Sequence, residues 1–406
     1  MVKVLRSLVR GPLEPYAAGF AEELTAQGYT CCSAEQHVGF IAHLDRWMAA
    51  HDLVAADLTG TMVQRYLADR RAAGYTNYRS LKAMRPLLDY LERLGVLPVE
   101  EDLPQGPVAE LLTRYTSYLL TERGVTRGTA RCYVDAVTPF VTSRLRDDGL
   151  DWAGLEPADI TGYVVATCPD RPRGTVKLIV TALRSLLGFT HVQGLITQPL
   201  ANAVPTARGR RLSGVPRPLD PAQVRQLLAS CDRRRRVGRR DYAIMVMLSR
   251  LGLRAGEVAA LTLDDVDWRT GRITLHGKGN RVEQLPLPAD VGAAITAYLR
   301  RGRPPTTHER ALFMRAKAPH RALTTAGVSM VVQDAAWRAG LGTMHAHRLR
   351  HTTATSMLHA GVPLEQVGLV LRQRRAMTTA MYAKVDTDAL RALARPWPLA
   401  TGGSRR

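Results

Sequence analysis

The spacing of apolar residues divides the chain into a helical first half and a mixed second half. In the first half, apolar positions recur every three or four residues between Gly- and Pro-marked turns, which predicts about four amphipathic helices in each of two similar units. The similarity is a diverged internal repeat with offsets of 96, 102 and 99 residues. The aligned pairs are EELTAQGYT (22–30) with YLLTERGVT (118–126), AADLTGTMVQRYLA (55–68) with PADITGYVVAT (157–167), and RPLLDYLERLG (85–95) with RSLLGFTHVQG (184–194).

Composition marks the boundaries between these units. EEDLPQGP (100–107) separates the two repeats, and ANAVPTARGRRLSGVPRP (201–218) is rich in Pro, Gly and Arg, as exposed linkers are. We therefore predict two helical domains, a basic linker, a further domain and a tail, with these bounds: 1–104, 105–200, 201–218, 219–395 and 396–406.

The second half mixes two periodicities. Asp220 and Pro221 are suited to the N-cap and first position of a helix, and RRDYAIMVMLSRLGL reads as a second, mostly buried helix. GRITLHGKGNRVEQLPLP (271–288) alternates apolar and polar residues on either side of GKGN, which predicts a β-hairpin. Because residues 289–395 again show a helical pattern, the expected fold class is mainly α with a small antiparallel sheet.

Charge is distributed very unevenly along the chain, whose formal net charge is +20. Residues 201–406 carry 35 Lys and Arg against 14 Asp and Glu, whereas residues 1–200 carry 21 against 22. Arg replacing Lys in a GC-rich genome would explain the many arginines but not the one-sided charge. The second half therefore indicates a polyanionic partner, most simply nucleic acid. CDRRRRVGRR (231–240) is expected to be either a phosphate-contacting patch, through Arg233, Arg234, Arg235 and Arg236, or a solvated loop.

Other sequence signals narrow the class of protein. No run of residues approaches the length of an apolar membrane span, and the N-terminus lacks a convincing signal peptide. The five cysteines (31, 32, 132, 168 and 231) show no metal-ligand spacing. Reduced thiols of this kind are typical of cytosolic proteins, so we predict a cytoplasmic, nucleoid-associated protein.

Four segments of the second half carry candidate chemistry. Arg254 follows a predicted helix end at Gly252, Lys278 lies at the hairpin tip, His347 and Arg350 lie one helical turn apart, and Tyr382 follows a run of arginines. Singly, each is more often a surface or core residue. HAHRLRH also offers a second register, His345 with Arg348.

Together these segments resemble the catalytic domain of the tyrosine recombinases, the phage integrase family, over residues 219–390. The matching segments are GLRAGEVAALTLDDVD, GKGNRVEQLPLP, HRLRHTTATSMLHAG and LEQVGLVLRQRRAMTTAMYAKV. The intervals also fit, with 24 residues from Arg254 to Lys278 and 32 from Arg350 to Tyr382. The family pattern His-x-Leu-Arg-His-Thr selects the register of His347 and Arg350. It also implies a multi-domain DNA clamp whose second repeat is the helical, SAM-like core-binding domain.

The resemblance implies DNA strand exchange without a metal or other cofactor. Tyr382 would be the nucleophile, and His347 would accept its proton or organise the phosphate. Arg254 and Arg350 would stabilise the charge of the transition state, because guanidinium groups stay charged and donate forked hydrogen bonds. Lys278 would protonate the leaving oxygen. Glu257, one turn after Arg254, would either orient that arginine or be a helix-surface charge.

One segment departs from the family pattern. Nine residues before the tyrosine, the family usually has Leu-Gly-His, whereas this chain has Leu371-Arg372-Gln373. The Gln373 amide can still donate a hydrogen bond to a phosphate oxygen, although it carries no charge. Arg372 would either add a phosphate contact or reflect a local change of backbone. Arg374 is a further candidate for DNA contact.

The resemblance also implies how the molecules assemble. Four protomers, of one or two kinds, would act on double-stranded DNA with an inverted-repeat core site. VDTDALRALARPWPLA (385–400) contains a short amphipathic helix that would pack into a neighbouring protomer, or else onto its own domain. The near-neutral first repeat would either grip the DNA or instead contact partner recombinases or accessory DNA. Two alternatives remain: a DNA-binding protein of this fold with decayed activity, and a nicking enzyme like the type IB topoisomerases.

Overall fold

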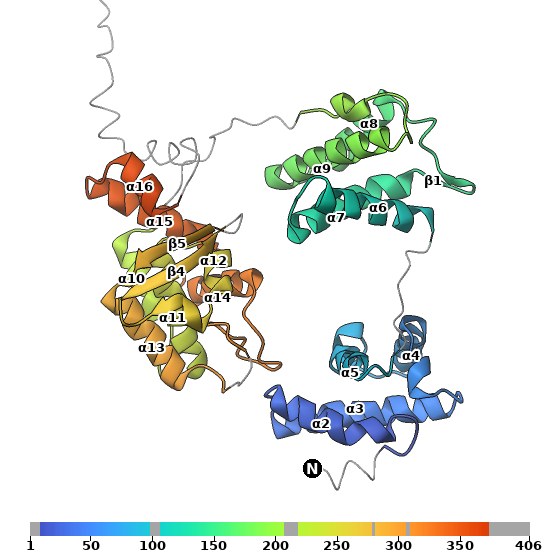
Figure 1. Cartoon of the computed structure of the whole chain (residues 1–406), viewed down its shortest axis with the longest axis horizontal. Coiled ribbons are helices and arrows are strands. Elements are labelled where there is room, and N and C mark those ends of the chain that lie inside the picture. Colours follow the sequence, from blue (N-terminus) through green and yellow to red (C-terminus); the bar gives the residue numbers. More distant parts are fainter. Residues whose placement is uncertain (1–8, 98–105, 207–217, 278–280, 306–308, 373–406) are drawn as a thin grey trace, which may run out of the picture. The chain divides into compact units, whose positions relative to one another are not determined.

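The computed structural model describes residues 9–97, 106–206, 218–277, 281–305 and 309–372 (Figure 1). The chain divides into two compact units, one made of residues 1–98 with 214–406 and the other of residues 99–213. Buried apolar side chains of the described residues form three large, separate clusters, which span residues 9–91, 111–204 and 219–349.

Residues 9–97 form a helical domain with its own core. Thr30 is the N-cap of the second described helix of this domain, since its Oγ1 accepts a hydrogen bond from the N–H of Ser33 at 3.3 Å. Asp45 is buried and accepts three backbone N–H groups from residues 10–13, which fixes the incoming chain against this helix. The elements are α2 (Glu14–Ala26), α3 (Cys31–Ala49), η1 (Ala55–Asp57), α4 (Gly60–Ala72) and α5 (Leu81–Arg93).

The second unit repeats this order of helices. Thr126 caps α7 by accepting from the N–H of Thr129, as Thr30 caps α3, and the two threonines differ by the repeat offset of 96. The unit adds a short hairpin of β1 and β2, which the apolar pattern did not predict. Its elements are α6 (Pro107–Thr121), α7 (Arg127–Ser143), β1 (Leu145–Arg146), β2 (Gly149–Leu150), α8 (Pro157–Thr167), α9 (Arg173–Val192) and η2 (Leu200–Ala203).

Helix α9 has the length and hydropathy of a membrane span, and among the described helices it alone does. Its apolar side chains nevertheless form the centre of the second unit's core, where Leu183, Leu186 and Leu187 are almost completely buried. The same core extends past residue 200, because η2 and Val204 pack into it. The expected linker over 201–218 is therefore wrong in its first residues, whose apolar side chains belong to this core.

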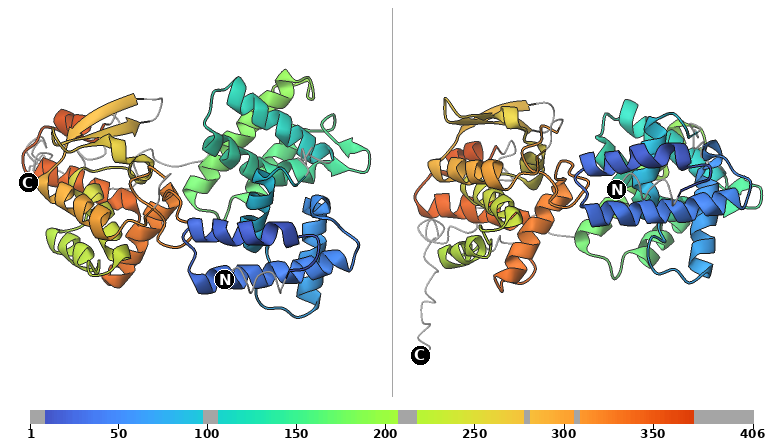
Figure 2. Two further views of the ribbon diagram at one scale, coloured as in Figure 1. Left: turned by 60° about the horizontal axis from the view of Figure 1, so that its bottom comes forward. Right: turned by 90° about the horizontal axis from the view of Figure 1, so that it is seen from below.

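Residues 218–372 form a mainly helical domain with a three-stranded antiparallel sheet in the order β3-β4-β5. Figure 2 shows the paired strands β4 and β5, in yellow, on one side of the helices of this domain. The elements are α10 (Pro221–Ala229), α11 (Arg236–Arg250), α12 (Ala255–Ala260), η3 (Leu263–Asp265), β3 (Val266–Asp267), β4 (Arg272–Gly277), β5 (Arg281–Pro286), α13 (Ala289–Arg301), α14 (Thr325–Arg338), α15 (Ala346–His359) and α16 (Leu364–Val370).

Among the described residues of this domain, the expected helix start at Asp220, the buried second helix and the hairpin are confirmed. Asp220 caps α10 by accepting from the N–H of Gln223 at 2.8 Å, and Pro221 is the first helical residue. Helix α11 is buried along most of its length, since it packs against α13, α14 and α15. Strands β4 and β5 pair from Arg272 opposite Pro286 to Gly277 opposite Arg281, as the alternation of apolar residues predicted. The two-residue strand β3 was missed.

Candidate active site

A sharp turn between α11 and α12 places the first candidate arginine. Gly252 adopts φ +57, which glycine tolerates and other residues disfavour, and it ends the run of α11. A Cβ at this position would lie 2.7 Å from Cδ2 of Leu371. Arg254 then forms the N-cap of α12, so the predicted position of Arg254 between two helices is confirmed.

Glu257 holds Arg254 through both its backbone and its side chain. The Arg254 N–H donates to Glu257 Oε2 at 2.9 Å, and Arg254 Nη1 donates to Oε1 at 2.6 Å. The Glu257 side chain is only 8% exposed, whereas that of Arg254 is 43% exposed. Burial alone would raise the pKa of Glu257, but the Arg254 N–H, the charge of Arg372 and the Arg254 guanidinium outweigh it and lower that pKa. Glu257 is therefore a buried carboxylate bonded to Arg254, rather than a surface charge.

Arg350 lies on α15 and is 1% exposed. Its Nη1 donates to the carbonyl of Gly252 at 2.5 Å, and its Nη2 donates to the carbonyl of Leu371. Thr353, on the same helix, donates to the Ser249 carbonyl at 2.8 Å and so fixes α15 against the end of α11. These bonds bring Arg350 to the turn that leads into Arg254, although the two residues are far apart in sequence.

His347 lies one helical turn before Arg350, near both arginines. Partial desolvation lowers the pKa of His347, and the charges of Arg350 and Arg254 lower it further. The neighbouring His351 packs edge-on against the His347 ring, with 5.1 Å between ring centroids. Desolvation, His347 and Arg350 lower the pKa of His351 to about 4. Both imidazoles are therefore neutral at pH 7, so His347 is in the state that accepts a proton.

The hairpin that carries Lys278 is placed by its strands. Gly277 pairs with Arg281, and Lys278 lies between them in the sequence and outside the described residues. On β4, His276 Nε2 lies 2.8 Å from Oδ1 of the buried Asp265, which joins β4 to the segment after α12.

The C-terminal segment reaches the site at residues 371 and 372. Arg372 follows α16 with φ +54, unusual for a residue other than glycine, and its side chain is only 7% exposed. Its Nη2 donates to Oε2 of Glu257 at 2.8 Å. The structure thus shows a left-handed backbone conformation and a buried ion pair here, not an exposed arginine. Gln373, Arg374, Tyr382 and the segment 385–400 lie outside the described residues.

The arginine run 233–236 does not belong to this site. It lies at the start of α11, whose 15 residues separate it from the Gly252 turn by about 20 Å. All four side chains are exposed, and Arg233 stacks over the ring of Tyr242 with 4.4 Å from Cζ to the centroid. A hollow of about 920 Å³ lies beside this run and is lined by five arginines: Arg233, Arg234, Arg239, Arg300 and Arg301.

Comparisons with known proteins show which proteins this chain resembles. The family model described as "Phage integrase family" matches residues 217–388. The putative integrase/recombinase y4rA of Sinorhizobium fredii (strain NBRC 101917 / NGR234) is 38% identical over 393 residues, which cover 96% of this chain and 95% of that protein. The chain belongs to the phage integrase family of tyrosine recombinases.

Two further comparisons extend this result. The tyrosine recombinase XerD of Mycobacterium leprae (strain TN) is 30% identical over 69% of this recombinase and 94% of its own length. A crystal structure of XerH site-specific recombinase bound to palindromic difH substrate shares the fold. It has a TM-score of 0.57 and 18% identity, and the match covers 73% of this chain and 98% of that one.

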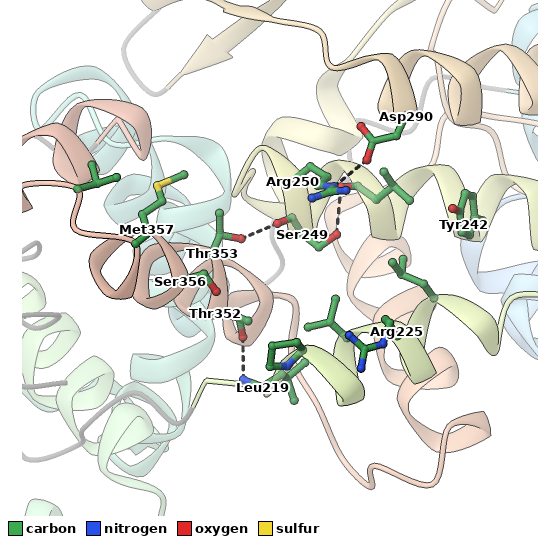
Figure 3. Close-up of a pocket in the computed structure, with 16 residues that line it drawn as sticks. Leu219, Arg225, Tyr242, Ser249, Arg250, Asp290, Thr352, Thr353, Ser356 and Met357 are labelled. Carbon is green, nitrogen blue, oxygen red and sulfur yellow. Dashed lines mark hydrogen bonds and ion pairs between the residues drawn. The ribbon is translucent and has the colours of Figure 1, made fainter. Parts of the chain in front are cut away.

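A groove of about 570 Å³ lies among α10, α11 and α15 (Figure 3). Its lining includes apolar side chains such as Val224, Leu228 and Met357. Thr352 accepts from the N–H of Leu219 at 2.9 Å at one edge, and Arg250 bonds Asp290 at 2.7 Å at another.

Sequence reasoning missed the role of three residues in this recombinase. Gly252 supplies a carbonyl to Arg350, Leu371 supplies another, and Arg372 binds the carboxylate that also bonds Arg254. Glycine directly after the predicted helix was a signal for the first. The other two depend on contacts between segments more than 20 residues apart, which no local pattern displays. Among the described residues, no group of three or more His, Cys, Asp or Glu side chains is placed to hold a metal ion.

Proposed function

We propose that this protein is a site-specific DNA recombinase that cuts and rejoins strands through a covalent 3′-phosphotyrosyl intermediate, without a metal or other cofactor. The observation that carries the proposal is the joint placement of Arg254 and Arg350 at the Gly252 turn, with the neutral His347 beside them. Two fixed guanidinium groups next to an imidazole suit an anionic phosphoryl-transfer centre.

In the proposed step, the Tyr382 oxygen attacks the scissile phosphorus, and the bond from phosphorus to the 5′ oxygen breaks. The phenol proton goes to His347, since a phenol with a pKa near 10 needs a base at neutral pH. Lys278 protonates the departing 5′ oxygen. Because one phosphodiester replaces another, a second DNA 5′-hydroxyl can reverse the reaction and reseal the strand.

Arg254 and Arg350 have distinct tasks in this proposal. Glu257 holds Arg254 from one side, and the 43% exposure of the Arg254 side chain leaves it accessible to a phosphate. Arg350 is bound to two backbone carbonyls, so its position depends on the turns at residues 252 and 371. Gln373 would add an uncharged hydrogen bond to the phosphate.

The proposed partner is duplex DNA with an inverted-repeat core site. The one-sided positive charge of residues 201–406 supports phosphate binding. The similar XerH recombinase is described in complex with the palindromic difH substrate. The exposed arginines around the hollow beside α11 would contact phosphates away from the cleaved bond, which agrees with Arg233–Arg236 as a DNA-binding patch.

The proposed active form is a tetramer in which residues 385–400 pack into a neighbouring protomer. The groove of Figure 3 supports this, because its apolar lining suits Leu390 and Leu393, and Arg225 at its edge suits the acidic Asp386 and Asp388. Leu390→Glu with Leu393→Glu should prevent assembly of two bound duplexes while single-duplex binding persists. Unchanged assembly would contradict the exchange.

A covalent-trapping assay tests the proposed function. Duplexes that wild-type protein binds are selected from a random pool, resynthesised with a nick beside the cleaved bond, and incubated with protein. We expect a covalent protein–DNA adduct that Tyr382→Phe abolishes. Specific binding without an adduct would indicate a DNA-binding protein with decayed activity. Supercoil relaxation without exchange between two duplexes would indicate a topoisomerase-like enzyme.

A further inference from the structure

We propose that Arg372 is a positioning residue that fixes Arg254 through the shared carboxylate of Glu257. This inference rests on the proposed function, since it assigns Arg372 a role in DNA cleavage. It gives a specific use to the residue that stands where the family usually has glycine.

Arg372 and Arg254 bind the same buried carboxylate from different segments. Glu257 Oε2 accepts from Arg372 Nη2 at 2.8 Å and from the Arg254 N–H at 2.9 Å, while Oε1 accepts from Arg254 Nη1 at 2.6 Å. With both oxygens occupied, the carboxylate has little freedom to rotate. The orientation of Arg254 therefore depends on the Glu257 carboxylate, which Arg372 holds in place.

Burial distinguishes this pair from a surface ion pair. The side chains of Arg372 and Glu257 are 7% and 8% exposed, so solvent screens their attraction weakly. A buried carboxylate beside only one arginine would lack part of the compensation for its lost hydration. The Arg372 guanidinium is thus enclosed by protein groups, whereas the side chain of Arg254 is 43% exposed.

Arg372 also reaches β5, the strand that begins at Arg281. Its Nε lies 3.7 Å from Oε2 of Glu283 on β5, and this buried Nε has no hydrogen-bond partner among the described residues. One cation thus contacts the acidic groups of two elements, α12 and β5. Arg372 makes these contacts from a strained backbone with φ +54. Glycine would adopt the same φ, but it has no side chain to make the contacts.

The preceding residue serves the other catalytic arginine. The Leu371 carbonyl accepts from Arg350, and Arg372 binds the carboxylate that holds Arg254. Two consecutive residues of one turn therefore set the positions of both arginines, and they lie eleven and ten residues before Tyr382 in the sequence. Docking of this turn would couple the segment that carries the nucleophile to the phosphate-binding arginines.

The test measures cleavage by full-length variants on the duplex selected with wild-type protein. Single-turnover rates at saturating protein and dissociation constants are compared for Arg372→Gly, Arg372→Lys, Glu257→Gln and the Arg372→Gly/Glu257→Gln double variant. Glycine tolerates the backbone of this turn, so Arg372→Gly removes the side chain without adding strain. Arg269→Met, an exposed arginine of the same domain, is the matched control.

We expect Arg372→Gly to slow cleavage by about 100-fold while DNA affinity stays within about twofold, because a small misplacement of a reacting group has effects of that size. Arg372→Lys should recover part of the rate. In the Glu257→Gln background, Arg372→Gly should slow cleavage by no more than about twofold, since both changes remove the same support.

The inference would be overturned if Arg372→Gly cleaved at the wild-type rate, or if it bound DNA more weakly but cleaved normally at saturating protein. It would also be overturned if the double variant showed the product of the rate losses of Arg372→Gly and Glu257→Gln. Thermal unfolding of each variant identifies any loss of cleavage that comes from misfolding. If Arg372→Gly misfolds, the cleavage rate of Arg372→Lys, which keeps the charge, tests the inference instead. If wild-type protein itself forms no adduct, the proposed function fails instead, which is a separate outcome.

Discussion

Arg350 is the residue whose surroundings define its task most completely. It is a fully buried cation whose guanidinium bonds two carbonyls from separate turns. Lysine keeps the charge but cannot reproduce the planar fork. We expect Arg350→Lys to raise the activation barrier of single-turnover cleavage by roughly 3 kcal/mol, as the loss of other transition-state donors does. Arg269→Lys is the control, and a wild-type rate for Arg350→Lys would contradict this role.

His347 makes a prediction about pH. Desolvation, Arg350 and Arg254 lower its pKa below the ordinary value of 6.5, so the neutral imidazole is the major form at pH 6.5. If His347 accepts the tyrosine proton, the cleavage rate should decline on the acid side as the ring becomes protonated, with a midpoint below pH 6.5. His347→Gln should be slower and should lose this acid-side decline. A decline that begins above pH 7, or that persists in His347→Gln, would assign the titration to another group.

The turn at Gly252, which follows α11, should be sensitive to substitution. Gly252→Ala would place a Cβ at φ +57 and 2.7 Å from Leu371 Cδ2, displacing the carbonyl that binds Arg350. Gly340→Ala is a matched control, since Gly340 also follows a helix with φ +68 but has open space around its Cβ position. We expect a loss of about 1 kcal/mol of unfolding free energy for Gly340→Ala from backbone strain alone.

For Gly252→Ala we expect a larger loss of unfolding free energy together with slower DNA cleavage, whereas Gly340→Ala should cleave normally. Urea denaturation and single-turnover cleavage measure the two effects. Equal destabilisation by both substitutions would show that the packing of this turn against Leu371 is unimportant.

The helices and the hairpin of the last domain could be predicted because their signals are local. Asp220 and Pro221 mark a helix start, and the alternation around GKGN marks β4 and β5. Strand β3 was missed because two residues are too few to show a period. The ion pair of Arg372 with Glu257 was missed for a different reason: 115 residues separate the partners, so only the folded chain brings them together.

For the molecule as a whole, the uneven charge predicts a steep dependence of DNA affinity on salt. Each neutralised phosphate contributes about 0.9 to the slope of log affinity against log salt concentration. Replacing Arg233, Arg234 and Arg300 by Gln should therefore lower the slope by about 0.9 for each phosphate that the variant no longer neutralises, and it should weaken binding to all sequences alike. Arg269→Gln should leave the slope unchanged. An unaltered slope in the triple variant would mean that the hollow beside α11 does not bind DNA.

Whole-chain similarity to y4rA shows the family of this protein, whereas the resemblance of its second half to a catalytic domain was already visible in four short segments. The sequence also showed the repeat of the first half. What it did not show is how the arginines are held, because that depends on carbonyls and a carboxylate from distant turns.

The most direct measurement is the chemical identity of the link between protein and DNA. A nicked duplex that the protein binds is incubated with wild-type protein, the adduct is digested, and the DNA-linked peptide is identified by mass spectrometry. We predict that the peptide containing Tyr382 carries a 3′-phosphate of the cut strand, that the other end is a free 5′-hydroxyl, and that Tyr382→Phe forms no adduct. Specific binding with no adduct, or a link to a different residue, would contradict the proposed recombinase.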